Sequence, residues 1–597
     1  MTRVTSLILS LGVLCAVAAA AEPGPLTTTV KLPDIKGGRY KGLTNEQMIE
    51  KMIEAAPARP IVPPGKPRKL LVFTMCTGYV HPAIPHMSAM LEIVGKKTGA
   101  YETVITDDPG FFEPEKLRAF DAVVMNNTVN QSVFLTADEQ KRLKAKDAAV
   151  QGKWERLKKS LSDFVTGGRG VVAFHGGADC GGMWPEYVEM IGGHFAGHPW
   201  SAKVVCRVES KDNAINAAVL PGKDFVEWAD EIYIFSKEYS RQTHRVLLSL
   251  DLEQCAAMYK DPVKWAADRG RPDGDNPMIW IKRHGQGRVY YSAFGGHLFE
   301  MTWTPDLVRH WLAGIQYALG DLKADDSPSG AASRPKIPSD AQVERIAAAA
   351  PTKAAAPKRP RKLLVFRGET SMPGRFTAAA IEQMGKKTRA YETEVASDVA
   401  VLAADRLRGY DALCLIDAGA LQGGKRPDKE QLAKISEMRR GLIRYVEEGH
   451  GLIVLGPAGE AAKGWTELGE LLGATPQWAP WTKAVLRKES PDHPVNVAAD
   501  CPPEFEVADR IYLLGDPYSH KAVRVLLSVD VEKSGIAGNK TQADRGRADG
   551  DYAVSWTKTA GQGRVYCNTL GSQPATSTHA VVLRHWLAGI QYALGDN

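Results

Sequence analysis

Histidines and glycines alternate in the stretch FHGGADCGGMWPEYVEMIGGHFAGHPW, which spans residues 174–200. It carries His175, His194, His198 and Asp179. Neutral imidazole suits zinc and similar divalent ions, and three histidines with or without a carboxylate leave a coordination position for a substrate oxygen. Without a metal, the same groups can act as general acid and base, because an imidazole titrates near pH ~6.5. The residue types leave both kinds of chemistry open.

The chain contains two copies of one unit. PRKLLVF at residues 67–73 recurs at residues 360–366, and GKKTGAYET from Gly95 recurs as GKKTRAYET from Gly385. RHWLAGIQYALGD begins at Arg309 and again at Arg584. Because the matches keep their order along the chain, they indicate a tandem duplication.

The second copy lacks the histidines of the first. His81 and His86 have no histidine counterpart, and Glu231 is replaced by Arg510. The other positions pair as follows: His175 with Gly456, His194 with Thr475, His198 with Ala479 and His297 with Gln573. A scaffold that is kept while its ionisable groups are lost indicates a functional pocket in the first copy. We expect His81, His175, His198 and His297 to form that pocket.

Other polar residues are kept in both copies, which favours structural roles. His310 is matched by His585 in an amphipathic terminal segment, and the DRGRPDGD loop with Asp268, Asp273 and Asp275 returns as DRGRADGD. Asp179 is matched by Glu460, so it could be a helix cap or a partner of the pocket. A thiol nucleophile at Cys180 is a weaker alternative, because the turn after GVVAF holds His175 and two glycines.

Strand-like and helix-like segments alternate within each copy. KLLVF (69–73), FDAVVMNN (120–127) and GVVAF (170–174) read as strands, and the segments 84–97 and 139–168 read as helices. Such alternation predicts a mainly parallel sheet covered by helices, in which ligands bind at the carboxyl ends of the strands. His81 and His175 each follow a predicted strand, so they should meet at that edge.

Length and composition bound the organisation. A chain of 597 residues is too long for one core. Residues 1–21 read as a secretory signal peptide, because a short apolar run ends in small residues, and no later segment is apolar enough to span a membrane. We expect a lead-in at 22–66, domains at 67–322 and 360–597, and a linker at 323–359. The net charge of +6 is spread along the chain without a basic stripe, which gives nucleic-acid binding little support.

Several motifs of the first copy resemble the ThuA-like (trehalose utilisation) family. They are FTMCTGYVHPAIP, FHGGADC, WPEYVEMIGGHFAGHPW, DEIYIF and NPMIWIKRHGQGRVYYSAFGGH. The resemblance implies two α/β domains in tandem, each a flavodoxin-like, class I glutamine amidotransferase-like three-layer sandwich, the second without its site. The family pattern points to His81, His175, Asp179, His198 and His297.

The resemblance also implies carbohydrate metabolism, often beside sugar oxidoreductases that make keto-glycosides. Our hypothesis is an exported protein, periplasmic or secreted, that acts on a sugar or keto-glycoside as a metal-dependent lyase or hydrolase. A divalent ion such as zinc would be held by His175, His198 and His194. Catalysis would fall to His81, His175, Asp179 and His297.

The alternative is a non-catalytic carbohydrate-binding or interaction protein. Trp184 and Trp200 could stack on a sugar, with Glu231 as a further substrate contact, although tryptophans in these positions fit core packing equally well. The sequence does not indicate an oligomeric state.

Overall fold

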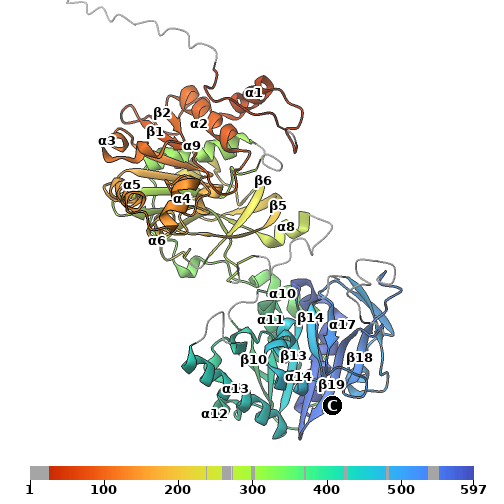
Figure 1. The fold of residues 1–597 in the computed structure, drawn as a ribbon. Coiled ribbons are helices and arrows are strands. Elements are labelled where there is room, and N and C mark those ends of the chain that lie inside the picture. Colours follow the sequence, from red (N-terminus) through yellow and green to blue (C-terminus); the bar gives the residue numbers. More distant parts are fainter. Residues whose placement is uncertain are drawn as a thin grey trace, which may run out of the picture.

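The protein folds into two α/β domains joined in series, as shown by a computed structural model (Figure 1). The structure describes residues 26–597 except 36, 237, 259–269, 272, 298–302, 369–371, 423–427, 479–482, 536–546 and 548–549. The predicted signal peptide at 1–21 and Asp268 of the DRGRPDGD loop therefore lie outside the described residues. Among the described helices, none is long and apolar enough to cross a membrane.

The first domain is built on one nine-stranded sheet. Its strands lie in the order β2 (Glu102–Thr106), β1 (Lys69–Phe73), β3 (Ala122–Asn126), β4 (Gly170–Phe174), β9 (Gly287–Ser292), β8 (Pro277–His284), β7 (Arg245–Leu250), β5 (Phe195–Val208) and β6 (Phe225–Phe235). The first five are parallel and the last four join antiparallel. The parallel part has the 2-1-3-4-5 order of flavodoxin-like sheets, which confirms the predicted fold class.

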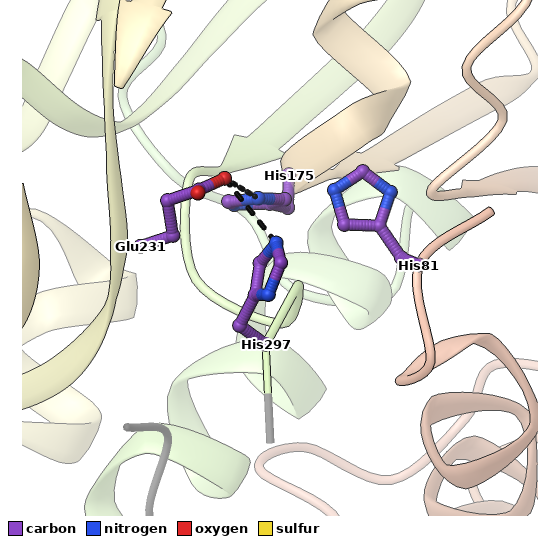
Figure 2. Close-up of side chains that lie close together, drawn as sticks. All are labelled: His81, His175, Glu231 and His297. Atoms are coloured by element: carbon purple, nitrogen blue, oxygen red, sulfur yellow. Dashed lines mark ion pairs between the residues drawn. The ribbon is translucent and has the colours of Figure 1, made fainter. Parts of the chain in front are cut away.

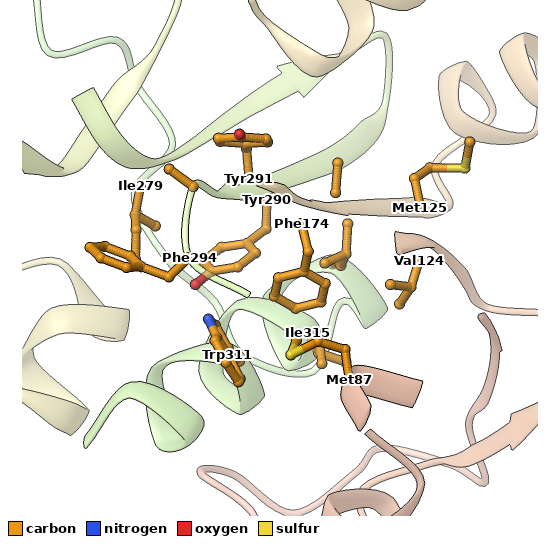
Figure 3. Close-up of a cluster of buried hydrophobic side chains, with 14 of the residues drawn as sticks. Met87, Val124, Met125, Phe174, Ile279, Tyr290, Tyr291, Phe294, Trp311 and Ile315 are labelled. Atoms are coloured by element: carbon orange, nitrogen blue, oxygen red, sulfur yellow. The ribbon is translucent and has the colours of Figure 1, made fainter. Parts of the chain in front are cut away.

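Helices cover both faces of this sheet. α2 (Ile84–Thr98) and α9 (Pro305–Leu319) lie on one face, and α5 (Ala148–Thr166) and α6 (Pro185–Ile191) lie on the other. Figure 3 shows Phe174 and Tyr290 pointing from the sheet toward α9, whereas Tyr291 points to the opposite side. All three side chains are fully buried. Neighbouring residues of one strand thus fill two separate layers of core, as strand pleating requires.

The terminal helix α9 has clear sequence signals at both ends. The Thr304 hydroxyl accepts from the Leu307 amide, Pro305 takes the first helical position, and Gly320 ends the helix with φ of 85°. Glycine is favoured there because only it adopts a positive φ without steric cost. Trp311 and Ile315 of this helix are buried beneath the sheet (Figure 3).

The second domain repeats this architecture. Its nine-stranded sheet has the order β11 (Glu392–Ala396), β10 (Lys362–Phe366), β12 (Ala412–Leu415), β13 (Gly451–Leu455), β20 (Gly563–Asn568), β19 (Ala553–Ala560), β18 (Arg524–Val529), β15 (Ala484–Lys488) and β16 (Glu504–Val507). β14 (Thr475–Trp478) and β17 (Tyr512–Gly515) form a separate pair. The main helices are α11 (Met372–Thr388), α13 (Lys429–Glu447), α14 (Thr466–Leu472) and α17 (Ala580–Leu594). The duplication read from the sequence is therefore a duplication of the whole fold.

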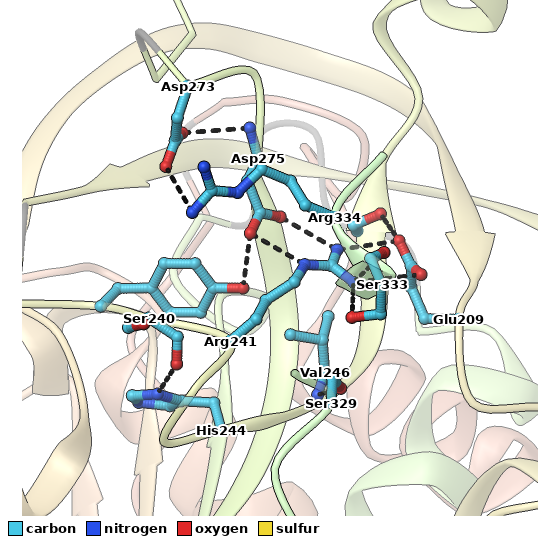
Figure 4. A network of polar contacts seen from close by, with 12 residues as sticks. Glu209, Ser240, Arg241, His244, Val246, Asp273, Asp275, Ser329, Ser333 and Arg334 are labelled. Carbon is cyan, nitrogen blue, oxygen red and sulfur yellow. Dashed lines mark hydrogen bonds and ion pairs between the residues drawn. The ribbon is translucent and has the colours of Figure 1, made fainter. Parts of the chain in front are cut away.

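Buried ion pairs hold the DRGRPDGD loop of the first domain in place (Figure 4). The guanidinium of Arg241 is 1% exposed and donates to both carboxylate oxygens of Asp275 at 2.8 and 2.9 Å. It also reaches Glu209, while Arg271 pairs with Asp273 at 2.9 Å. The described aspartates of the loop thus serve its structure, as their presence in both copies indicates.

The segment that leads to the second domain lies against the first. The Ser329 amide donates to the His244 carbonyl, and the Gly330 amide donates to the Arg241 carbonyl, both at 2.8 Å. Arg241 in turn donates to the Ser333 carbonyl (Figure 4). We predicted a linker here, and these hydrogen bonds fix the path of residues 329–333 along the first domain.

The helix α10 (Asp340–Ala349) begins the second copy, as α1 (Asn45–Ala55) begins the first. Both helices start with a capping box, formed by Thr44 and Gln47 in α1 and by Ser339 and Gln342 in α10. α10 also contacts the first domain, because Gln342 donates to Glu253 of α8 (Leu252–Met258) at 2.8 Å. The lead-in helix of the second copy is therefore part of the interface between the domains.

The buried His310 predicts how stability depends on pH. Burial lowers the pKa of His310 to about 3, and its ring nitrogens contact Tyr290 and Asn216 at 3.0 Å. In the unfolded chain the imidazole of His310 titrates near pH ~6.5, so the unfolded state binds the proton before the folded state as the pH falls. The stabilisation is therefore complete above pH ~6.5 and is lost as the pH falls from there toward 3.

We expect His310→Gln to reduce the slope of the free energy of unfolding against pH by up to about 1.4 kcal/mol per pH unit. Urea unfolding between pH 7 and 4 measures this slope. His585, which is equally buried in the second domain, provides the matched control. His585→Gln should flatten only the transition of the second domain. Unchanged slopes in both variants would contradict the assignment.

Candidate functional site

Four side chains of the first domain converge at the carboxyl edge of the sheet (Figure 2). They are His81 from the loop after β1, His175 directly after β4, Glu231 of β6 and His297 from the loop after β9. One ligand atom from each lies within 4.8 Å of the other three. Three of the four follow parallel strands, so the sheet itself brings them together.

His175 sits in a left-handed backbone conformation, with φ of 41°. Two contacts hold it there: the Tyr291 hydroxyl donates to the His175 carbonyl at 3.0 Å, and Nδ1 of His175 lies 2.7 Å from the Ala293 carbonyl. A carbonyl accepts only, so Nδ1 carries the proton and Nε2 keeps its lone pair. Nε2 is buried, makes no hydrogen bond among the described residues, and lies 3.5 Å from Oε2 of Glu231.

The glycine next to His297 makes room for the His175 ring. A Cβ atom on Gly296 would lie 2.0 Å from Cδ2 of His175, so no larger residue fits there. Gly176 has a similar role, since its Cβ would lie 2.9 Å from Cε1 of His81. The glycines of these motifs thus let imidazoles approach the backbone closely.

A buried carboxylate positions His297. The side chain of Asp230 is fully buried and accepts from the backbone amides of Gly295, Gly296 and His297 at 2.6 to 3.1 Å. It also accepts from the amide of Glu231. Asp230 therefore ties the loop after β9 to β6, and this brings Nε2 of His297 to 3.2 Å from Oε2 of Glu231.

His81 completes the group as a neutral imidazole. Its ring lies edge-on to those of His175 and His297, with centroids 5.0 Å apart in each case. Burial, followed by the nearby His175 and His297, lowers the pKa of His81 to about 3. The Tyr233 hydroxyl lies 3.4 Å from Nε2 of His81. At neutral pH His81 is therefore a free base with a lone pair to offer.

Glu231 is the negative charge of the site. Burial by itself would raise its pKa, but the adjacent imidazoles of His175 and His297 outweigh burial and hold the pKa far below the ordinary value. The carboxylate is therefore ionised over the whole physiological range. We predicted Glu231 as a substrate contact, and the structure places its carboxylate beside three imidazoles.

Two further histidines lie next to the four. His198 is exposed, and its Nδ1 lies 3.3 Å from the other carboxylate oxygen of Glu231. His194 is half-buried, and its Nε2 makes no hydrogen bond among the described residues. We predicted both as metal ligands with His175, but neither belongs to the group of four. Ala479, the counterpart of His198, lies outside the described residues.

Asp179 faces the three histidines of the 174–200 stretch. Burial raises its pKa above the ordinary value, and the charges of His194, His175 and His198 act in the opposite direction. Asp179 is the C-cap residue of the short 3-10 helix η2 (His175–Ala178), is not the N-cap of α6, and is not one of the four converging groups. Its place between buried and exposed imidazoles suits a group that accepts and releases protons.

The remaining candidates lie in the core or away from the site. Trp184 and Trp200 are each 2% exposed, so their faces are covered by protein, which favours packing over sugar stacking. Burial raises the pKa of the Cys180 thiol to about 12, which argues against a thiolate nucleophile. His86 in α2 is buried and contacts the Pro82 carbonyl.

Sequence comparison between the copies missed Asp230 and Tyr233. Both are kept in the second domain, as Asp509 and Tyr512. Asp509 likewise accepts from the amides of Gly571 and Ser572. We searched for residues that the second copy has lost. That search cannot find a residue that supports the backbone in both copies and is therefore kept in both. No difference between the copies marks Asp230 or Tyr233, because both copies keep them.

Comparison with known proteins agrees with the duplication. A family model described as ThuA, trehalose utilisation, matches residues 69–318 and again residues 362–593. The chain belongs to the ThuA family. The two matches together span most of its length, and they coincide with the two sheets. Among curated proteins none matches this sequence.

Solved structures of ThuA-like proteins are similar to parts of the chain. One from Bacteroides uniformis is 15% identical, covers 40% of this chain and 94% of its own length, and has a TM-score of 0.32. One from Parabacteroides merdae is 16% identical, covers 40% of this chain and 90% of its own length, and has a TM-score of 0.30. Each covers about one domain of this protein.

The positive φ at His175 predicts the relative stability of two variants at this position. Alanine at this position keeps the steric cost of a Cβ in the left-handed region, whereas glycine removes it. We expect His175→Gly to be more stable than His175→Ala by about 1 kcal/mol in urea unfolding. Equal stabilities, or a more stable alanine variant, would contradict a left-handed conformation.

Removal of the Asp230 charge should loosen the site. In Asp230→Asn the amide group would face backbone N–H donors that now meet a carboxylate, so we expect a loss of about 3 kcal/mol in the stability of the first domain. Binding of Zn²⁺, followed by calorimetry, should weaken as His297 moves. Asp509→Asn is the matched control, since it should destabilise the second domain and leave Zn²⁺ binding unchanged. Wild-type Zn²⁺ affinity in Asp230→Asn would contradict the positioning role.

Proposed function

We propose that the first domain binds a divalent metal ion through His81, His175, His297 and Glu231, and that it processes a sugar or keto-glycoside at this site. The observation that carries the proposal is the convergence of four ligand atoms within 4.8 Å in the domain that belongs to a carbohydrate-utilisation family. The second domain is proposed to have no catalytic role, since Gly456, Arg510 and Gln573 replace three of the four ligands.

The donor set fits a first-row divalent ion. Imidazole and carboxylate together suit zinc, manganese and related ions. The tautomer of His175 is fixed by Ala293, so that its lone pair faces the group, and His81 is held neutral. This is the arrangement by which surrounding hydrogen bonds prepare a histidine ligand. An ion with five or six coordination positions would retain room for substrate.

A bound ion would supply Lewis acidity toward a carbonyl or hydroxyl oxygen of the substrate. The neighbouring side chains can move protons. His198 contacts Glu231 on one side and solvent on the other, and it could exchange a proton with a substrate at the mouth of the site. Asp179, with its raised pKa, could take up or supply a second proton. Removal of a proton beside a keto group followed by loss of a β-linked aglycone requires these two functions.

A non-catalytic carbohydrate-binding protein is the second candidate. Its support was the pair Trp184 and Trp200, and both are covered by protein. The convergence of three imidazoles and a carboxylate is not required for sugar binding alone. We also propose export to the periplasm or beyond, which rests on the apolar run in residues 1–21 and on no structural feature.

Metal content tests the proposal most directly. We expect about one divalent ion per chain in mass spectrometry of the purified protein. His175→Ala and Glu231→Ala should each weaken Zn²⁺ binding by about 10- to 100-fold or more, because each removes a ligand. Turnover of keto-glycosides should fall in parallel.

The matched control is Arg510→Ala, which changes the equivalent position of the second domain and should alter neither metal content nor turnover. A protein that turns over keto-glycosides without metal, or that keeps its metal in Glu231→Ala, would rule out the proposed ligand set. Sugar binding without metal and without turnover would favour the non-catalytic candidate.

A further inference from the structure

A second cavity lies between the two domains. Its volume is about 360 Å³, within the range of small-molecule sites. The first domain contributes the end of β7 and α8, including Leu250 and Ala256. The segment before α10 and the second domain supply the remaining walls, including Ile337, Phe376 and Gln573. None of these residues belongs to the group of four described above.

The cavity occupies the edge at which the second copy has lost its site. Phe376 stands at the position of His86, and Gln573 stands at the position of His297. Gln573 follows β20, whose end lies in register with the end of β13. The carboxyl edge of the second sheet thus borders a pocket. An amide stands there in place of His297 of the group of four, and an aromatic ring stands in place of the buried His86, which lies outside that group.

Gln573 carries a hydrogen-bonding group that the protein leaves unused. The residue is only 7% exposed and lines the cavity. Its side-chain amide makes no hydrogen bond among the described residues. A ligand with a hydroxyl or carbonyl group could replace solvent as the hydrogen-bond partner of this amide. The amide can both donate and accept, so a hydroxyl satisfies it in either sense.

The charges around the cavity are already paired. Arg207 meets Asp251 at 2.7 Å, and Arg345 pairs with Glu253. Lys336 pairs with Asp340 of its own helix region. An ionic ligand would have to break one of these pairs, whereas a neutral ligand would leave them intact. Leu250, Ile337 and Phe376 offer apolar surface to one face of such a ligand.

We infer that this cavity is a second small-molecule site, for an uncharged molecule that combines an apolar face with hydroxyl groups. The site is independent of the metal ligands of the first domain. Because its walls come from both domains, an occupant would stabilise their relative arrangement. The second copy thus keeps a binding role after the loss of its imidazoles.

Two probes of similar size separate neutral from charged recognition. Phenyl β-D-glucoside is neutral and amphipathic, and phenyl β-D-glucuronide adds a carboxylate. The full chain carrying His175→Ala is titrated with each by calorimetry, so that the first site does not contribute. We expect the glucoside to bind at millimolar concentration or below and the glucuronide to bind at least about tenfold more weakly, a difference of about 1.4 kcal/mol.

Variants of the cavity locate the binding. Gln573→Leu removes the amide and Ala256→Trp fills the space, and either change should weaken glucoside binding about tenfold or more. Gln562→Leu, the same substitution at an exposed residue of the second domain, should leave it unchanged. No glucoside binding, equal binding in all variants, or tighter binding of the glucuronide would each overturn the inference. Absence of a bound divalent ion from the wild-type protein, together with retained glucoside binding, would instead count only against the proposed function of the first domain.

Discussion

The site of the first domain depends on a single backbone corner. The chain leaves β4 at His175 with φ of 41°, a conformation that costs a residue with a Cβ about 1–2 kcal/mol. The Tyr291 hydroxyl and the Ala293 carbonyl hold that corner from the neighbouring strand. Without the corner the imidazole would follow the strand direction and would not face Glu231. The stored strain is therefore the condition for the convergence of the ligands.

A second constraint acts through Asp230. Its carboxylate accepts four backbone amides and thereby fixes the loop of His297 relative to the strand of Glu231. Neither Asp230 nor Tyr291 is among the four converging side chains. The geometry of the site is thus set by residues that serve the backbone, and the second domain keeps the same device in Asp509. This explains how one copy could lose its chemistry without loss of the fold.

The sequence predicted the duplication, the flavodoxin-like sheet and a pocket that includes three of the four converging side chains, His81, His175 and His297. Strand ends and lost histidines are both visible in the printed residues. It did not place Glu231 with the three histidines, because β6 joins the sheet antiparallel and the rule for parallel strand ends does not apply to its residues. His194 and His198 were grouped with His175 through nearness along the chain. In space the long strand β5 carries His198 to the far side of the Glu231 carboxylate. The path of the linker between the domains could not be predicted from the sequence, because hydrogen bonds from the Ser329 and Gly330 amides to main-chain carbonyls leave no trace in composition.

Gly456, at the turn after β13, makes loss of the histidine in the second copy easier than its return. Gly456 adopts φ of 57°, almost the angle of His175, so the second copy keeps the bend without a side chain. A mutation back to histidine would restore the steric penalty at once, while Arg510 and Gln573 offer the new ring no partner ligands. A single reversion to histidine would therefore cost stability without restoring the group of four. Glycine at this turn removes the backbone strain and thereby disfavours a return to histidine. The second copy can then diverge toward functions that need no imidazole at this position.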